Sequence, residues 1–357
     1  MVDQLKKEQC CGCELCVSVC PVNAIRMEMD SEGFRYPSID SGKCINCGKC
    51  DRFCVIQNYE SVRCNIQMAF ACRHMDDEVR KASTSGGVFT PFAIQTLDDG
   101  GVVYGVEFDA KWSVVFNRAE KKDDAMRFRL SKYPQAQVRR IYESVKKDLD
   151  YGRKVFFTGT PCQVSALMKY VGKGYENLYT MDFICLGIAS PGIWEWYLDN
   201  VHNRENITAI NFKSKVLGWK DWHVMFDENG KKTWESNREN NYMHDFCTGI
   251  NTRPSCFVCP FKGIDHVSDF TISDCWGLGE SLKINDDKGL SALLIHTQKG
   301  VDLFNKVKEC FLLERHDANQ LMINNRATFG HLYVNVNRED FFRGEKWKEW
   351  RWVGKEY

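Results

Sequence analysis

Eighteen cysteines occur in this chain of 357 residues, and nine of them lie between Cys10 and Cys54. Eight of the nine form two groups that share the spacing C-x2-C-x2-C-x3-C. This spacing is typical of proteins with two 4Fe-4S clusters, where three thiolates of one run bind one cluster and the fourth binds the other. We therefore expect one cluster on Cys10, Cys13, Cys16 and Cys54, and the other on Cys44, Cys47, Cys50 and Cys20.

Two alternatives apply to these cysteines. Structural zinc also uses CxxC pairs, but it rarely takes its four ligands from such a three-plus-one run. A disulfide scaffold is typical of short secreted chains, which this is not. Val55 replaces the proline that follows the last ligand of such runs, and we expect no effect on ligation. Cys11 lacks the two-residue spacing to Cys13 that Cys10 has, so we predict a free thiol there.

Overall charge excludes some partners. Lys plus Arg equals Asp plus Glu at 48 each, so no net charge favours nucleic acid or an anionic membrane surface. Residues 1–9 lack the apolar region of a signal peptide, and no stretch approaches the roughly 20 apolar residues of a membrane span. We expect a cytoplasmic location, and small molecules and other proteins as partners.

The elements that position these cysteines change in character along the chain. Residues 1–60 carry an internal repeat and predict a compact cysteine-rich module. Alternating patterns then follow, with strands predicted at 68–72, 102–108, 154–159 and 178–185, and helices at 87–97, 138–149, 163–171 and 192–201. Beyond residue 206, shorter polar strands at 207–214, 222–228 and 231–236 suggest an antiparallel or mixed extension, and the part after Lys299 reads as mostly helical. The fold class is an α+β ferredoxin-like module followed by an α/β domain with a mixed sheet.

Six motifs in the larger part carry a resemblance to a known family. They are STSGGVF, GGVVYGVEF, LSKYPQA, VFFTGTPCQV, DFICLGIASP, and RPSCFVCPFK with SDFTISDCWG. In this order they resemble the coenzyme F-420 hydrogenase/dehydrogenase beta subunit family, over nearly the whole chain. The resemblance implies a flavin-binding domain with FAD and a third 4Fe-4S cluster between the flavin and the other centres. Residues 61–150 would be its N-terminal part, and residues 151–357 the part with the third cluster and the flavin and substrate site.

The resemblance also directs attention to possible flavin contacts. The hydroxyl and glycine-rich stretch from Ser83 to Gly87 precedes a predicted helix and would offer free N–H groups to a pyrophosphate; the alternative is an ordinary helix cap. Lys132 and Tyr133 could supply a cation and a stacking ring, or could lie on the surface and in the core. The turn at Gly159 ends a strand, where α/β sheets bind ligands. The expected cofactor-binding residues are Ser83, Ser85, Gly86, Gly87, Lys132, Tyr133, Gly159, Thr160, Pro161 and Asp274.

Four further cysteines are candidates for the third cluster. Cys162 and Cys185 follow the ends of predicted strands, and Cys256 and Cys259 form a CxxC pair. Soft thiolate sets in a redox protein favour an iron-sulfur cluster. Alternatively, Cys162 and Cys185 are buried apolar residues, and the CxxC pair binds zinc or nothing. If one of these four cysteines is not a ligand, the candidates to replace it are Cys247 and Cys275. The cysteines expected to be structural are Cys64, Cys72 and Cys310.

These expectations together predict an iron-sulfur flavoprotein oxidoreductase. A flavin exchanges two electrons as a hydride, whereas each cluster carries one electron. Electrons would pass between ferredoxin or a redox partner subunit and a small-molecule hydride donor or acceptor. We assign no catalytic side chain, although Lys132, His223 or Asp274 could position substrate or move a proton. The alternatives are an electron-transfer subunit with no substrate site of its own, and a scaffold domain for a biosynthetic complex.

Overall fold

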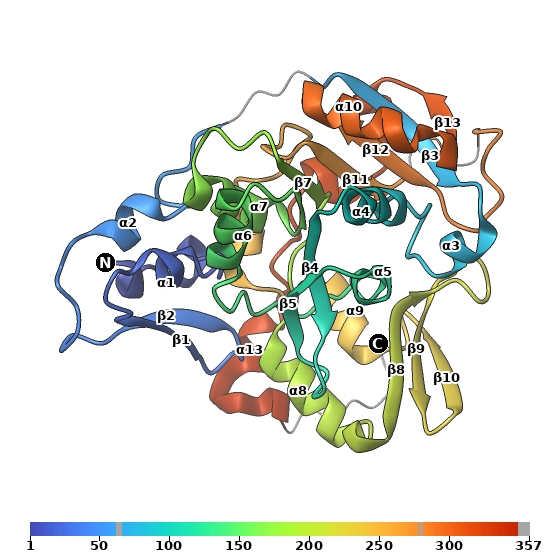
Figure 1. Ribbon diagram of the computed structural model, residues 1–357. Helices are drawn as coiled ribbons and strands as arrows, with labels where there is room; N and C mark the ends of the chain where they lie inside the picture. Colours follow the sequence, from blue (N-terminus) through green and yellow to red (C-terminus); the bar gives the residue numbers. More distant parts are fainter. Residues whose placement is uncertain (62–65, 277, 279–280, 349–357) are drawn as a thin grey trace.

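The N-terminal module consists of two short helices and a hairpin. The computed structural model describes residues 1–61, 66–276, 278 and 281–348 (Figure 1). In it, α1 (Leu15–Val19) and α2 (Lys49–Phe53) each follow a cysteine loop, and both begin after a residue in the left-handed conformation, Glu14 and Gly48. Strands β1 (Ile25–Met29) and β2 (Arg35–Ile39) pair antiparallel. The 3₁₀ turns η1 (Val2–Gln4) and η2 (Lys7–Gln9) precede α1. The sequence repeat thus produces two equivalent loop-helix units.

A large mixed sheet organises the rest of the chain. Its order is β13-β3-β12-β11-β7-β6-β4-β5 in the described residues. The bounds are β3 (Met68–His74), β4 (Val102–Phe108), β5 (Val114–Ala119), β6 (Val155–Thr158), β7 (Leu178–Phe183), β11 (Phe270–Asp274), β12 (Ser291–Ile295) and β13 (Phe311–Arg315). The pairs β4–β6, β6–β7 and β7–β11 are parallel, and the remaining pairs are antiparallel. The carboxyl ends of β4, β6, β7 and β11 therefore meet at one edge.

Helices cover both faces of this sheet. On one face lie α6 (Ile141–Asp150) and α7 (Pro161–Val171), and on the other α4 (Phe89–Asp98) and α10 (Gln298–Val307), with α3 (Asp77–Lys81) and α5 (Lys122–Met126) nearby (Figure 1). Neighbouring residues of a strand point to opposite faces. Phe157 of β6 accordingly packs with Tyr142 of α6, whereas Phe156 packs with Phe92 of α4. Each face thus has its own apolar core.

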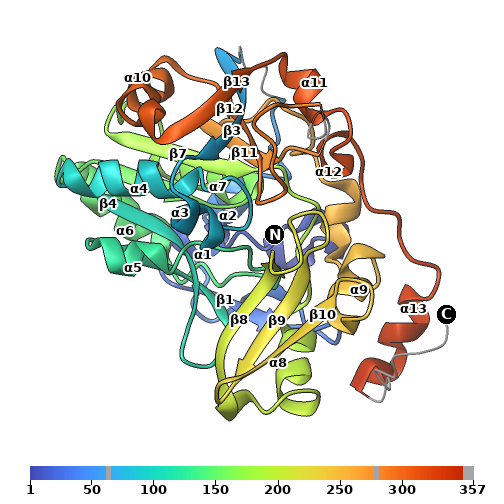
Figure 2. The same cartoon turned by 90° about the vertical axis from the view of Figure 1, so that its right-hand side faces the viewer.

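A second, smaller sheet extends the molecule. Strands β8 (Ile207–Ser214), β9 (His223–Glu228) and β10 (Lys231–Ser236) form an antiparallel sheet, and Figure 2 shows the three strands side by side. Helices α8 (Pro191–Asn200), α9 (Asn241–Cys247) and α13 (Arg338–Phe342) belong to the same core, in which Trp194, Phe226 and Tyr242 are buried. The remaining elements are η3 (Arg204–Asn206), η4 (Pro254–Val258), η5 (Lys308–Cys310), α11 (Ala318–Met322), α12 (Arg326–Phe329) and η6 (Arg343–Lys348).

Most predicted elements are confirmed, including the mostly helical character of the part after Lys299. The strands predicted at β3, β4, β6 to β10 and the helices predicted at α4, α6, α7 and α8 are present within a few residues of their expected ends. Besides these helices, the part after Lys299 contains one strand, β13, which was not predicted and which pairs with β3 at the edge of the sheet. Its five residues, FLLER, are too few to distinguish a helical period from a strand period.

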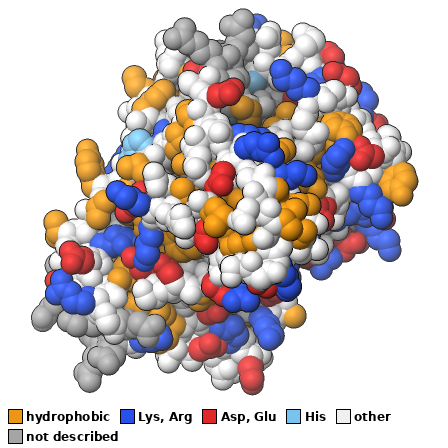
Figure 3. Space-filling model, turned by 90° about the vertical axis from the view of Figure 1, so that its left-hand side faces the viewer, with side chains coloured by type: hydrophobic (Ala, Val, Ile, Leu, Met, Phe, Trp, Pro, Cys, Tyr) orange, Lys and Arg blue, Asp and Glu red, His pale blue; other side chains and the backbone are white. Residues whose placement is uncertain are grey.

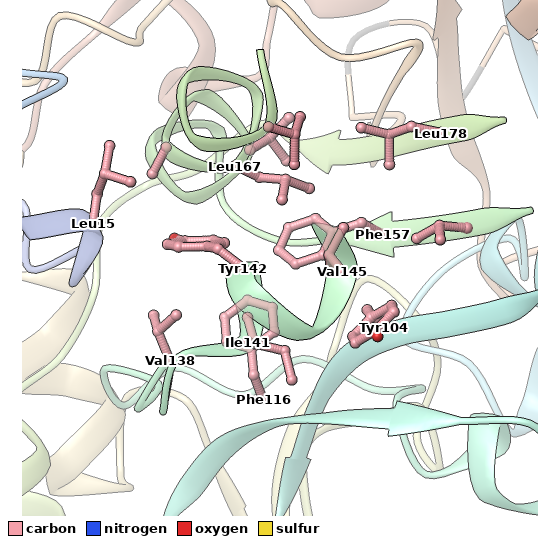
Figure 4. Packing of buried hydrophobic residues seen from close by; sticks show 14 of the residues in the cluster. Leu15, Tyr104, Phe116, Val138, Ile141, Tyr142, Val145, Phe157, Leu167 and Leu178 are labelled. Carbon is pink, nitrogen blue, oxygen red and sulfur yellow. The ribbon is translucent and has the colours of Figure 1, made fainter. Parts of the chain in front are cut away.

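The N-terminal module packs into the core of the larger part. Leu15 of α1 is fully buried and lies with Tyr142 and Leu167 in the core beneath α6 and α7 (Figure 4). The carboxylate of Glu14 accepts hydrogen bonds from the backbone N–H groups of Val138, at 3.1 Å, and Arg139, at 3.2 Å. The two parts therefore fold against one another. Over the described residues, no helix has the length and apolar character needed to cross a membrane.

Candidate functional site

The second cysteine run and the last cysteine of the first run surround one cavity. This cavity has a volume of about 180 Å³, and its wall includes Cys20, Cys44, Cys47 and Cys50, which we call the outer thiol group. Cys20 reaches it from the end of α1, as the crossed ligand pattern requires. Cys47 is exposed, so the cavity opens at the surface. Figure 3 views the molecule from the side of this module and shows hydrophobic side chains among charges of both signs.

The other predicted set, Cys10, Cys13, Cys16 and Cys54, is the inner thiol group. Burial raises the pKa of the Cys16 thiol, and the neighbouring thiols of Cys10 and Cys54 raise it further. Cys54 therefore lies with the first run although it belongs to the second. The Tyr142 hydroxyl donates to the backbone oxygen of Cys13 at 3.0 Å, which ties this loop to α6.

The four candidates for a third cluster also come together. Cys162 lies in the first turn of α7, Cys185 follows β7, and Cys256 and Cys259 lie in and just after η4. Burial and the Cys256 thiol raise the pKa of Cys185, while burial and the Cys259 thiol raise that of Cys256 to about 12. Burial and the Cys162 thiol raise the pKa of Cys259 to about 11. These four cysteines, the third thiol group, thus form a connected set at the carboxyl edge of the sheet.

The donor chemistry of the three groups suits cubane clusters. All cysteines in the described part of the chain are free thiols. In that part of the chain, no group of three Cys, His, Asp or Glu side chains has an arrangement that could hold a single metal ion. Zinc holds its sulfur ligands about 2.3 Å from one ion, whereas a 4Fe-4S cluster offers a separate iron to each thiolate.

The remaining cysteines take other places. Cys72 and Cys275 are fully buried, in β3 and next to the end of β11, and Cys310 packs partly buried against the core under α10. Cys247 ends α9, where burial raises its pKa to about 11. Cys64 lies outside the described residues. The apolar environments of Cys72, Cys275 and Cys310 fit a structural role.

The turn before α7 lies directly beside the third thiol group. The amide of Gly159 donates to the Met181 carbonyl of the neighbouring strand at 3.2 Å. Thr160 caps α7 in a capping box with Gln163, and Pro161 occupies the first turn. The Thr160 hydroxyl lies 3.1 Å from the sulfur of Cys162. A molecule bound at this turn would therefore be close to the third thiol group.

The Ser83 to Gly87 stretch differs from the prediction. The hydroxyl of Ser85 donates to the Leu290 carbonyl at 2.7 Å, and the amide of Gly86 donates to the Ser291 hydroxyl at 2.9 Å. The Ser83 hydroxyl donates to the Val79 carbonyl. The expectation of a free N–H at Gly86 is wrong, because this amide is bound to Ser291, the first residue of β12. The helix-cap alternative is also wrong, since α4 begins after Val88 with no side-chain cap.

Close packing explains the glycine at position 86. A Cβ atom there would lie 2.5 Å from the carbonyl oxygen of Cys72. Gly87 has a φ of +86°, which glycine adopts without strain. These two glycines therefore let the stretch lie against β3.

Lys132 and Tyr133 are both turned inward. The Lys132 ammonium donates to the carbonyl oxygens of Arg129, at 2.7 Å, and Leu130, at 3.2 Å, and burial lowers its pKa to about 7. Lys132 is partly exposed, with its ammonium group bound to backbone carbonyls. The Tyr133 ring packs against Phe212 and Phe246, as its core alternative expected.

Asp274 ends β11 at the same edge and has a partner that the sequence did not suggest. The Lys213 ammonium, almost fully buried, donates to one carboxylate oxygen of Asp274 and lies 4.8 Å from the ring centroid of Trp276. The pKa of Tyr133 is raised mainly by burial. The charge of Asp274 is a smaller cause of the same shift, so these two side chains are neighbours. The sequence feature that could have indicated Lys213 is the NFKSK segment at the end of β8, where Lys213 and Lys215 are two residues apart. His223 instead points its Nδ1 atom to the Asp221 carbonyl, 2.8 Å away.

Sequence reasoning also missed the residues that join the inner and third thiol groups. Cys11, which we predict to be a free thiol, has a raised pKa because of a hydrogen bond with Cys13, and a second hydrogen bond joins it to Cys162. The Arg253 guanidinium is fully buried and donates to the backbone oxygen of Cys10 at 2.7 Å. No local pattern could reveal these contacts, because the partners are more than 100 residues apart.

Comparisons with known proteins find two family models and a similar solved structure. A family model for the C terminus of the coenzyme F-420 hydrogenase/dehydrogenase beta subunit matches residues 152–320, and a 4Fe-4S dicluster domain matches residues 9–58. No curated protein matches the chain. A chain of the F-420-reducing NiFe hydrogenase complex from Methanosarcina barkeri is similar at 17% identity, over 70% of this chain and 82% of that chain, with a TM-score of 0.48.

The dicluster match covers both cysteine runs of the N-terminal module, and the C-terminal match contains Cys162, Cys185, Cys256 and Cys259. The chain therefore combines a 4Fe-4S dicluster domain with a region that matches the C terminus of the coenzyme F-420 hydrogenase/dehydrogenase beta subunit, the arrangement of an iron-sulfur electron-transfer protein related to this oxidoreductase family.

Proposed function

We propose that this protein is an iron-sulfur flavoprotein oxidoreductase. It passes electrons between a one-electron carrier, either ferredoxin or a partner subunit, and a small-molecule hydride donor or acceptor through FAD. The observation that carries the proposal is the succession of three thiol groups from the surface of the module to the carboxyl edge of the large sheet. Each group suits one 4Fe-4S cluster.

The order of the groups supports a route for single electrons. The outer group lines a cavity that opens at the surface, where a carrier protein can approach. Cys20 and Cys54 cross between the two runs of the module and bring the outer and inner groups together. Cys11 then lies between Cys13 of the inner group and Cys162 of the third group. The third group thus stands between the module and the edge of the sheet.

That edge has the side chains that an anionic cofactor needs. Lys213 is almost fully buried there, Lys215 is partly buried, and desolvation lowers the pKa of Lys215 to about 8. One carboxylate oxygen of Asp274 is buried without a hydrogen-bond partner among the described residues. FAD, when bound, exchanges two electrons as a hydride and passes them on singly. Lys213 and Lys215 would balance its negative charge, and Asp274 and Thr160 would orient it.

Metal and flavin analysis after anaerobic purification tests the proposal. We expect about twelve iron atoms and one FAD per chain. The Cys185→Ser variant should retain about eight iron atoms, and the Cys310→Ser variant, altered outside the three groups, about twelve. About eight iron atoms in the unaltered protein would remove the third cluster, and clusters without flavin would instead assign an electron-transfer subunit with no substrate site.

A further inference from the structure

We propose that Arg253 raises the reduction potential of the inner cluster above that of the outer cluster and so favours electron transfer from the outer to the inner cluster. The inference rests on the proposed function in one respect, that Cys10, Cys13, Cys16 and Cys54 hold a cluster. It concerns a residue outside every predicted ligand set, in the loop that leads to Cys256.

Arg253 is held in place by contacts to three separate segments. Its Nε donates to the backbone oxygen of Cys10 at 2.7 Å, and its Nη2 lies 3.5 Å from the sulfur of the same residue. Nη2 also donates to the carbonyl of Arg35, at 3.1 Å, and Nη1 donates to the side-chain oxygen of Gln135, at 2.8 Å. The guanidinium lies 4.2 Å from the ring centroid of Tyr36. The orientation of its fork towards Cys10 is therefore fixed.

Gln135 supports this orientation from the other side. Its side-chain nitrogen donates to the backbone oxygen of Gly12 at 3.2 Å. A Cβ atom at position 12 would lie 2.1 Å from that nitrogen, and Gly12 has a φ of +68°. The glycine thus allows the cysteine loop to approach Gln135 and Arg253 closely.

The charge of Arg253 has no carboxylate partner. The ion pairs of the described residues do not include it, although its side chain has no exposed surface. An isolated buried charge is unfavourable, and the sulfur of Cys10 lies 3.5 Å from the guanidinium. A cluster with four thiolate ligands is itself anionic, so it supplies the missing counter-charge.

Such a contact acts on the reduction potential. Reduction adds one negative charge to the cluster, and a fixed positive charge with an N–H directed at a ligand sulfur stabilises the reduced form. The outer thiol group has an arginine of a different kind. Arg52 is exposed and donates only to the backbone oxygen of Cys47, at 3.3 Å, where water screens its charge. The inner cluster should therefore have the higher potential.

Potentiometric titration followed by electron paramagnetic resonance tests this difference. In Arg253→Met, with iron at the wild-type level, we expect the midpoint of one cluster to fall by 59 mV or more, which is a tenfold change for one electron. Arg52→Met is the matched control and should change every midpoint by less than half of that. Full iron with unchanged midpoints in Arg253→Met would overturn the proposal and leave Arg253 a structural residue.

A second measurement uses protein in which Arg253 is intact. It therefore tests the proposal even if the Arg253→Met variant loses iron. Protein carrying Arg52→Met is labelled with ¹⁵N in its arginine guanidinium groups, and the hyperfine couplings of the reduced clusters are recorded. We expect one cluster to show coupling to arginine nitrogen, and its absence would overturn the proposal. Failure of the proposed function is distinguishable, because the unaltered protein would then lack cluster iron in its N-terminal module.

Discussion

Cys20 and Cys54 are the residues on which the crossed arrangement of the module depends. Each ends a short helix, α1 or α2, and turns towards the loop of the other run. Cys20 lies on the wall of the outer cavity, and Cys54 contributes to the raised pKa of Cys16. The fourth cysteine of each run thus supplies the last ligand of the cluster that the other run holds.

We predict that Cys20→Ala and Cys54→Ala remove different clusters. Each variant should lose about four iron atoms, because each removes one of four ligands. Cys20→Ala should retain the inner cluster, with its sensitivity to Arg253, and Cys54→Ala the outer one. Iron analysis with electron paramagnetic resonance checks this, and identical surviving signals in both variants would contradict the crossed arrangement.

His296 belongs to a buried polar group beside β7 and β11. Its Nε2 lies 2.9 Å from the hydroxyl of Thr271, which donates to Asp182 at 2.6 Å. Burial lowers the pKa of His296 to about 4, below its ordinary value of about 6.5. Between these values the unfolded chain binds a proton that the folded chain does not. The contribution of His296 to stability is therefore full above pH 6.5 and falls as the pH decreases towards 4.

We predict that His296→Gln reduces this acid sensitivity. Between pH 6.5 and 5.0, the wild-type free energy of unfolding should fall more than that of the variant, by about 1 to 2 kcal/mol. Anaerobic denaturant titrations at the two pH values measure the difference. His266→Gln tests the neighbouring ring, whose pKa is raised despite burial because Asp182 favours its charged form. The contribution of His266 to stability is full below pH 6.5 and falls as the pH rises above this value, which is the opposite sign to His296. Equal changes in both variants would contradict the assignment.

At the scale of elements, the sequence predicts β3, β4, β6 and β7 of the large sheet, whereas β5, β11, β12 and β13 are found only in the structure. Strands β4, β6 and β7 are apolar runs between turn residues, so their buried position could be predicted. Strand β13 is short and lies at the edge, where half of its side chains face solvent, and its pattern suits a helix equally well. The cysteine groups could be predicted from spacing, but the contacts of Cys11 and Arg253 depend on packing between distant segments.

The hairpin of the module meets the start of α8 through two glycines. The amide of Gly192 donates to the Gly33 carbonyl at 3.0 Å, and a Cβ atom at Gly192 would lie 2.6 Å from the Cα atom of Gly33. Backbone atoms on both sides leave no flexible group to move. We predict that Gly192→Ala lowers the free energy of unfolding by about 1 to 3 kcal/mol, measured by anaerobic denaturation.

Gly42→Ala is the control for this contact. Gly42 belongs to the same module, and a Cβ atom there would meet only the Asp40 side chain, at 3.4 Å. This variant should change the free energy of unfolding by less than about 0.5 kcal/mol. An equal loss in both variants would show that the approach of the hairpin to α8 does not limit stability.

At the scale of the whole molecule, the three thiol groups and the sheet edge form one line of contacts. We predict that Cys185→Ser interrupts it between the dicluster module and the flavin. Rapid mixing with a reduced ferredoxin should still reduce the two clusters of the module, while flavin reduction slows by a factor of ten or more. Cys310→Ser should behave as wild type, and unchanged flavin reduction in Cys185→Ser would contradict the route.

Leu15 and Glu14 lie within the first cysteine run and also complete the interior beneath α6 and α7. The segment that contains four of the predicted iron ligands thus also supplies part of the hydrophobic core. A newly made chain could not finish its interior until the metal had arrived, and a chain that lost iron to oxygen would loosen there first. Iron supply would then control how long the protein survives in the cell, as well as whether it can transfer electrons.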